Sequence, residues 1–140
     1  MLNRGYKEFA SDIKEIFDTI VGKYKFIIVE ENEEQVILES NNCVITISIL
    51  DYWEVGLFLS NIRSNLKYDI WKVNTILKKS LNNLPDLSLS EKEIFNNDKN
   101  YREFIKARIK RGFQLISINL TDVLEGDFSW VDKYKIRYIK

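Results

Sequence analysis

Residues 43–62 read CVITISILDYWEVGLFLSNI, two apolar runs that meet at Asp51-Tyr52-Trp53-Glu54. The large apolar side chains stand at every second position, which are Cys43, Ile45, Ile47 and Ile49 in the first run and Trp53, Val55, Leu57 and Leu59 in the second. A period of two is typical of β-strands packed on one face. The connection is too short for a crossover, so the two runs are predicted to pair antiparallel.

Two further apolar runs, at 24–30 and 34–40, precede this hairpin and are separated by equally short polar turns. With 43–50 and 53–61 they predict a four-stranded antiparallel meander. Apolar and polar residues alternate along these runs, so one face of the sheet is expected to be apolar and the other polar. Helices are therefore expected mainly on the apolar face. Phe58 is an exception on the polar face, where either the C-terminal tail around Trp130 or a partner would cover it.

The segment before the meander carries apolar residues at steps of three and four, namely Tyr6, Phe9, Ile13, Ile16 and Ile20. This spacing predicts an amphipathic helix over 4–21, closed by Gly22 as a left-handed cap.

Three to four helices are predicted after the meander. Asp69 is expected to cap a helix that carries Ile70, Val73, Leu77 and Leu81 and ends before Pro85. Ser90 and Glu93 have capping-box spacing and predict a short helix to about residue 95, before the longest helix at 99–119. Gly112 within that helix indicates a close helix contact or a bend. The tail after Gly126 holds Phe128, Trp130, Val131 and Tyr134 and is predicted to dock as a short helix. The fold class is therefore α+β, in a single domain over 1–140.

Composition excludes several kinds of chemistry. The 140 residues include no histidine and one cysteine, Cys43. Because Cys43 begins an apolar run, we expect it to be a small buried hydrophobic residue. A histidine-based nucleophile or base and a zinc site of the usual ligands are therefore ruled out, and no phosphate-binding glycine loop is present. Carboxylates at 30–34 and at Asp122, Glu125 and Asp127 leave a carboxylate enzyme or metal site open, without a matching metal-loop spacing. We expect a non-enzymatic protein with no cofactor.

The chain also lacks a secretory signal and an apolar run long enough to cross a bilayer, which favours a cytoplasmic protein with no membrane partner.

Charge is divided between the two halves although the formal net charge is zero. Residues 1–70 carry 7 Lys and Arg against 12 Asp and Glu, and residues 71–140 carry 14 against 9, so the halves differ in sign. A candidate surface for a basic protein partner consists of the residues Glu30, Glu31, Glu33, Glu34, Asp51, Tyr52 and Glu54. A solvated turn and a hairpin whose aromatics simply pack remain the alternatives.

A second candidate surface lies on the long helix, where Arg102, Lys106, Lys110 and Arg111, with Arg108, would present a basic face to nucleic acid. The sequence pI is near 6.4, and the chain has no known nucleic-acid recognition motif. Both observations count against this alternative and favour a solvated helix face.

The order of elements is similar to that of a group of small uncharacterised bacterial α+β proteins. The similarity covers the N-terminal helix, the segment VITISILDYWEVGLFL and the helices ending in LEGDFSWVDKY. Some of these proteins are regarded as immunity proteins of polymorphic or contact-dependent toxin systems. The resemblance implies a protein that binds and blocks a cognate toxin, and it assigns no functional residues because such proteins vary most where they bind.

Overall fold

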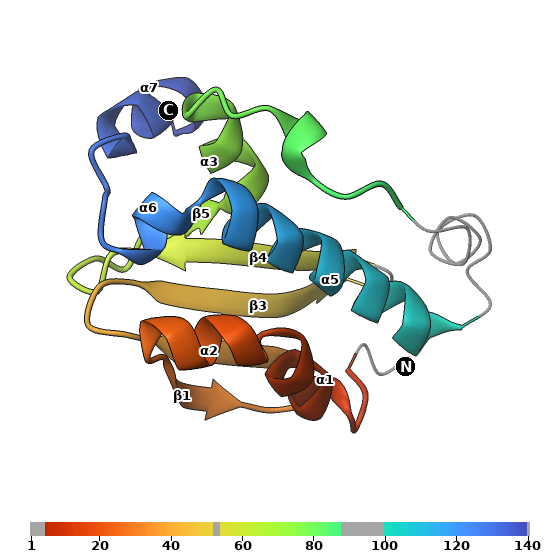
Figure 1. Cartoon of the computed structure of the whole chain (residues 1–140). Helices are drawn as coiled ribbons and strands as arrows, with labels where there is room; N and C mark the ends of the chain where they lie inside the picture. The colour runs from red at the N-terminus through yellow and green to blue at the C-terminus, as the bar shows by residue number, and fades with distance from the viewer. Residues whose placement is uncertain (1–4, 52–53, 88–99, 140) are drawn as a thin grey trace.

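The sheet is antiparallel, as predicted, and has one strand more than expected. The computed structural model describes residues 5–51, 54–87 and 100–139 (Figure 1). Its strands follow one another in chain order, β1 Ile27–Glu31, β2 Gln35–Glu39, β3 Val44–Asp51, β4 Glu54–Ser60 and β5 Tyr68–Asp69. The predicted meander is thus confirmed, and the two-residue strand β5 extends it beyond β4.

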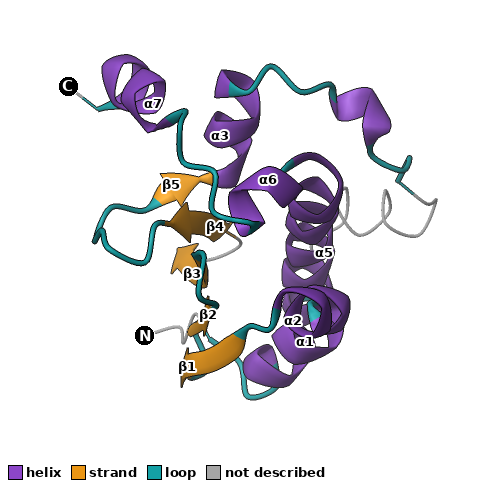
Figure 2. Cartoon of the chain, turned by 60° about the vertical axis from the view of Figure 1, so that its left-hand side comes forward, coloured by secondary structure: helices purple, strands orange, loops and turns teal. Residues whose placement is uncertain are grey.

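The described helices cover one face of the sheet. The other, which we call the open face, has no described helix over it (Figure 2), although its Thr46 is only 1% exposed. Register places Ile45 opposite Leu59 and Ile47 opposite Leu57, and these four side chains are buried. Thr46 and Phe58 form a pair on the opposite face. Figure 2 shows the described helices gathered on the first of these faces, with α7 beside the β5 edge. The expectation of helices mainly on one face is confirmed.

The described helices are α1 Phe9–Ile16, α2 Asp18–Tyr24, α3 Ile70–Ile76, α5 Tyr101–Asn119, α6 Thr121–Leu124 and α7 Val131–Tyr138, with a 3-10 turn η1 at Leu81–Asn83. The longest, α5, crosses the sheet between α1 and α3 (Figure 1). Three predictions fall outside the described residues: the short helix at 90–95, Tyr52 as a partner contact, and Trp53 among the alternating apolar residues of its strand.

The prediction of one continuous N-terminal helix is wrong. The helix breaks at Phe17, whose side chain is fully buried, and α2 ends at Lys25 in the left-handed conformation with φ 59°. The N–H of Phe26 closes this end on the carbonyl of Val21, a Schellman-type bond. Gly22 lies inside α2 and is not its cap, so the first strand begins three residues later than predicted, at Ile27.

The helix that begins at Asp69 is shorter than predicted. Asp69 does cap it, accepting from the N–H of Trp71, but α3 ends at Ile76 and Leu81 is 51% exposed. A buried asparagine pair explains the early end. Asn119 Nδ2 donates to Asn74 Oδ1 at 2.9 Å and to the Ser80 carbonyl at 3.0 Å, and Asn74 Nδ2 donates to the Lys79 carbonyl. These bonds satisfy the backbone at 79–80 outside a helix.

The long helix is confirmed, with Asn100 accepting from the N–H of Glu103 as its N-cap. Gly112 marks a close approach to the sheet and, less tightly, to α3, where Ile70 Cδ1 would lie 3.3 Å from an added Cβ. A Cβ built on Gly112 would lie 2.7 Å from Leu57 Cδ2. The glycine therefore lets α5 settle onto β4.

The docked tail is also confirmed. Trp130 and Tyr134 pack edge-on against the ring of Tyr68, with centroids 5.1 and 4.9 Å away, and Tyr134 Oη accepts from the N–H of Asp69 at 3.1 Å. Tyr68 is paired with Leu59, on the helix-covered face, so the tail packs on the face opposite to Phe58. The ring of Phe58 instead leans over Gly56, where an added Cβ would meet it at 2.6 Å.

Candidate functional site

The meander brings the two acidic turns to the same end of the sheet. In a meander the first and third turns lie at one end and the second and fourth at the other. The first turn holds Glu30 to Glu34, and the third joins Asp51 to Glu54. The first turn is bonded to the strand that leads into the third, because the N–H of Ile49 in β3 donates to the carbonyl of Glu34 at 2.8 Å. We call this surface the acidic end, defined by its described residues Glu30, Glu31, Glu33, Glu34, Asp51 and Glu54.

The backbone of the first turn is organised by Asn32. Its Oδ1 accepts from the N–H groups of Glu34 at 2.8 Å and Gln35 at 2.9 Å, which forms an Asx turn. The carbonyl of Glu33 accepts from the N–H of Tyr6 at 3.2 Å. Gly5 contacts the same carbonyl so closely that no Cβ could fit there. The turn is therefore held in one shape from two sides while the Glu33 side chain stays exposed.

Glu30 and Glu31 each have a polar partner within the same chain. Glu31 pairs with Lys14 of α1 at 2.8 Å, with both side chains about half exposed. Such surface pairs contribute little to stability. Glu30 accepts from Gln35 Nε2, and Gln35 Oε1 in turn accepts from Ser48 Oγ at 2.7 Å on the open face. These contacts orient the carboxylates without removing them from solvent.

The strand beside this turn is an unexpected feature. All five residues of β1 are exposed, including three apolar ones, with Ile27 at 64%, Ile28 at 38% and Val29 at 48%. The run Phe26 to Val29 has the unbroken apolar pattern of a buried strand. Only its place at the edge of the sheet explains the exposure, so sequence reasoning missed Ile27, Ile28 and Val29 as surface residues.

Arg102, predicted to contact nucleic acid, pairs with the buried carboxylate of Asp12, although 42% of the Arg102 side chain is exposed. Its Nε and Nη2 donate to the two carboxylate oxygens of Asp12 at 3.0 and 2.9 Å, and Tyr6 Oη donates to Asp12 Oδ2 at 3.0 Å. Asp12 is only 2% exposed. Burial by itself would raise the pKa of this carboxyl, but the bonds from Arg102 and Tyr6 and the charge of Arg102 outweigh it, and the pKa is lowered. Arg102 therefore joins α5 to α1.

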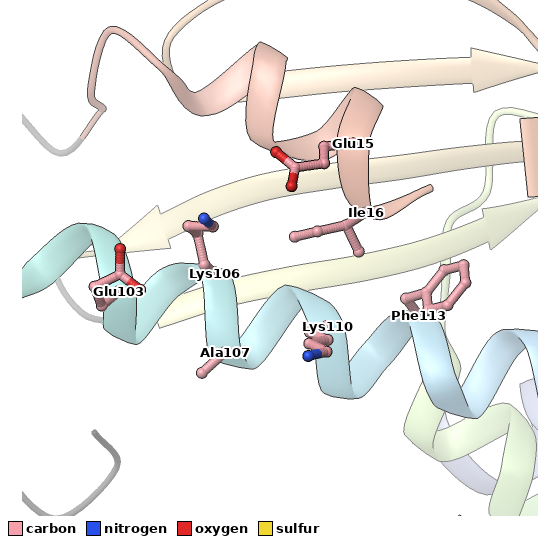
Figure 3. A pocket seen from close by; sticks show the side chains of 7 residues that line it. All are labelled: Glu15, Ile16, Glu103, Lys106, Ala107, Lys110 and Phe113. Carbon is pink, nitrogen blue, oxygen red and sulfur yellow. The ribbon is translucent and has the colours of Figure 1, made fainter. Parts of the chain in front are cut away.

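The other basic residues of α5 divide between two grooves. Lys106 and Lys110 face α1 in a groove of about 370 Å³, shown in Figure 3, whose described lining is Glu15, Ile16, Glu103, Lys106, Ala107, Lys110 and Phe113. Two glutamates in the same groove offset the two lysines. The groove is thus apolar with mixed charge, and not a positive surface suited to a phosphate backbone.

The second groove, of about 430 Å³, lies on the other flank of α5, with a described lining of Val55, Leu57, Trp71, Phe104, Arg108 and Arg111. The Arg108 guanidinium stands 5.4 Å from the centre of the Phe104 ring. Arg111 Nη1 donates to the Pro85 carbonyl and to Gln114 Oε1. The five basic side chains of α5 therefore do not share one face.

Two of the remaining chemical candidates, Cys43 and Asp127, take part in structural contacts, whereas the Asp122 and Glu125 side chains are exposed. Cys43 is buried, which raises the pKa of its thiol to about 12. The Asp127 carboxylate accepts from the N–H of Ser129, and its hydrogen bonds with Ser129 lower its pKa. Within residues 5–51, 54–87 and 100–139, His, Cys, Asp and Glu form no group that could hold a metal ion. Over the same ranges, every helix is too short or too polar to cross a membrane.

No family model matches the chain, and no match was found among curated proteins or among solved structures.

Proposed function

We propose that this is a binding protein that uses its acidic end to hold a basic protein partner, in the manner of an immunity protein that neutralises a toxin. The observation that carries the proposal is the meeting of two acidic turns at one end of the sheet, with Glu34 of the first bonded to Ile49 in the strand that leads into the third. Carboxylates clustered in this way steer a basic partner toward the surface and set its orientation.

The ordered backbone of the first turn adds support. That turn is held by Asn32 and by the backbone of Tyr6, and the strands that lead to the third turn pair as far as Asp51 and Glu54, with an irregularity in register between Ile49 and Asp51. A surface that is ordered before binding loses less conformational entropy on association. The first turn therefore combines charge with a preset shape.

The experiment is co-expression with the product of the neighbouring gene, followed by pull-down and measurement of association rates. Glu33→Lys and Glu54→Lys should each slow association by about 10-fold at low salt, the lower end of what electrostatic steering supplies. Glu125→Lys is the matched control. Glu125 is exposed, and the adjacent Gly126 lies next to Asn42 at the opposite end of the sheet.

Two results would count against the proposal. Equal slowing by Glu125→Lys would show that only overall charge matters and that the acidic end is not the binding surface. If no complex forms and the neighbouring product is not toxic alone, the immunity role loses its main support.

The nucleic-acid alternative now rests on Lys106 and Lys110 alone, since Arg102 holds Asp12 and the other arginines lie on the far flank of α5. We expect no salt-sensitive retention on DNA or RNA columns. Retention that falls steeply with salt, and is lost in Lys106→Glu, would restore that alternative.

A further inference from the structure

The exposed edge strand β1 lacks most of the devices that protect such strands. A free sheet edge carries backbone N–H and C=O groups that can pair with another strand, and proteins usually block it with lysine, proline, a bulge or a covering segment. Within the described sheet, β1 has a neighbour only in β2. Its sequence IIVEE holds no lysine or proline, and its protection consists of the charges of Glu30 and Glu31 at its end and an irregularity in register between Ile28 and Glu30.

The charges along this strand follow a strict order. Lys23 and Lys25 come before it, three apolar residues form its first part, and Glu30, Glu31 and Glu33 end it or follow it. When two copies of such a strand pair antiparallel, the basic end of each meets the acidic end of the other. The arrangement is self-complementary, which is what a two-fold symmetric interface requires.

We propose that β1 is a homodimerisation strand that pairs antiparallel with β1 of a second copy of this chain. A two-fold axis at Ile28 places Ile27 opposite Val29 of the second copy. It also brings Glu31 of the second copy to the start of β1, next to Lys25, the left-handed C-cap of α2 that precedes the strand. The exposed apolar side chains of the two β1 strands then cover one another across the interface. Glu31, already beside Lys14, gains a second cation.

A second copy suits this edge better than a uniformly basic strand would. A basic strand paired along β1 would bring positive charge against Lys23 and Lys25 at its other end. The dimer leaves Glu33, Asp51 and Glu54 accessible, because these residues of the acidic end lie at the end of the sheet and not along its side. Glu30 and Glu31 belong to both surfaces, since they are residues of β1. The antiparallel arrangement places the two acidic ends at opposite ends of the joined sheet. The inference does not rest on the proposed function, although the two share Glu30 and Glu31.

Pairing over a short strand gives a small interface. Interfaces below about 1,200 Å² belong to the weak and transient class. The bulge near Val29 shortens the continuous ladder further. We therefore expect a dimer that dissociates on dilution.

Sedimentation equilibrium of the full chain, from micromolar to millimolar concentration, tests the proposal. The wild type should pass from monomer to dimer with rising concentration. Lys25→Glu and Glu31→Lys should each remain monomeric, because both symmetric contacts become like-charged. An equimolar mixture of the two variants should form a heterodimer, since each variant supplies the charge that the other lacks, and the double variant should dimerise with itself. Val29→Lys, at an exposed position, should stay folded by circular dichroism and monomeric.

A wild type that stays monomeric throughout the range would overturn the proposal. So would a dimer that both single charge variants retain, which would place the interface elsewhere. If the wild type is monomeric and Val29→Lys weakens binding of a basic partner, β1 is an edge for that partner and not for a second copy, because Val29 lies outside the acidic end. Dimer formation is measured on the isolated chain, so its failure is distinguishable from failure of partner binding at Glu33 and Glu54.

Discussion

Replacing Gly22 or Gly112 by alanine should change the free energy of unfolding in opposite directions. Gly112 and Gly22 both lie inside helices, α5 and α2, but their surroundings differ. A Cβ on Gly112 would stand 2.7 and 2.9 Å from the two methyl groups of Leu57 and 3.3 Å from Ile70 Cδ1, whereas a Cβ on Gly22 would meet nothing within 4 Å. The comparison isolates packing from helix propensity.

The magnitudes follow from two opposing effects. Replacing glycine by alanine within a helix gains about 1 kcal/mol at either site. At Gly112 the added methyl must displace the buried Leu57, and overpacking of this kind costs about 1–3 kcal/mol. Gly22→Ala should therefore raise the free energy of unfolding by up to about 1 kcal/mol, and Gly112→Ala should lower it by roughly 0–2 kcal/mol.

Urea denaturation monitored by circular dichroism measures both changes. With a slope of about 1–3 kcal/mol per molar urea, the two midpoints should differ by roughly 1 M. Leu57→Ala alone should cost about 2–5 kcal/mol through the cavity it leaves. The double variant with Gly112→Ala should be less destabilised than the sum of the single changes, because the new methyl group occupies space that Leu57 vacates. Equal stabilisation at both glycines, or strict additivity with Leu57→Ala, would refute the close contact.

Three further outcomes follow from the buried polar groups. Because the pKa of Asp12 is lowered in the folded state, its stabilising contribution is present above its ordinary value of 3.8 and lost as the pH falls through the folded value. Urea midpoints should therefore fall less steeply with acid in Asp12→Asn than in the wild type, and parallel curves would contradict this. Asn119→Ala should cost roughly 1–3 kcal/mol by leaving Asn74 and the Ser80 carbonyl without their donor, and an unchanged midpoint would show that these bonds are replaced. Cys43 should resist thiol reagents near neutral pH until denaturant is added, and rapid labelling of the folded chain would contradict its burial.

Short-range patterns were enough to predict most elements of the fold. The period of two in 43–62 predicted the central hairpin, and the short turns required antiparallel pairing before any contact was known. The spacing of apolar residues in the long helix and in the tail predicted α5 and the docking of α7. These signals are reliable because strand and helix periods are set by the local backbone geometry.

Element ends and the short strand β5 could not be predicted in the same way. The first helix is interrupted at Phe17, whose buried ring packs edge-on against Phe113, and α3 stops where Asn119 binds the backbone at 79–80. Leu81 fits the helical spacing but lies on the surface. In each case a residue distant in the chain competes with local propensity, and burial or a satisfied hydrogen bond outweighs it.

The candidate site shows the same division. The sequence by itself determined the acidic turns, the absence of histidine and the order of charge around β1, since these are properties of neighbouring residues. Tertiary structure alone decided that Arg102 pairs with Asp12, that the remaining basic residues lie on two flanks of α5, and that the apolar run 27–29 is an exposed edge. The physical reason is that pairing and burial depend on which segments meet in space, and this is settled by packing of the whole chain and not by any one stretch of it.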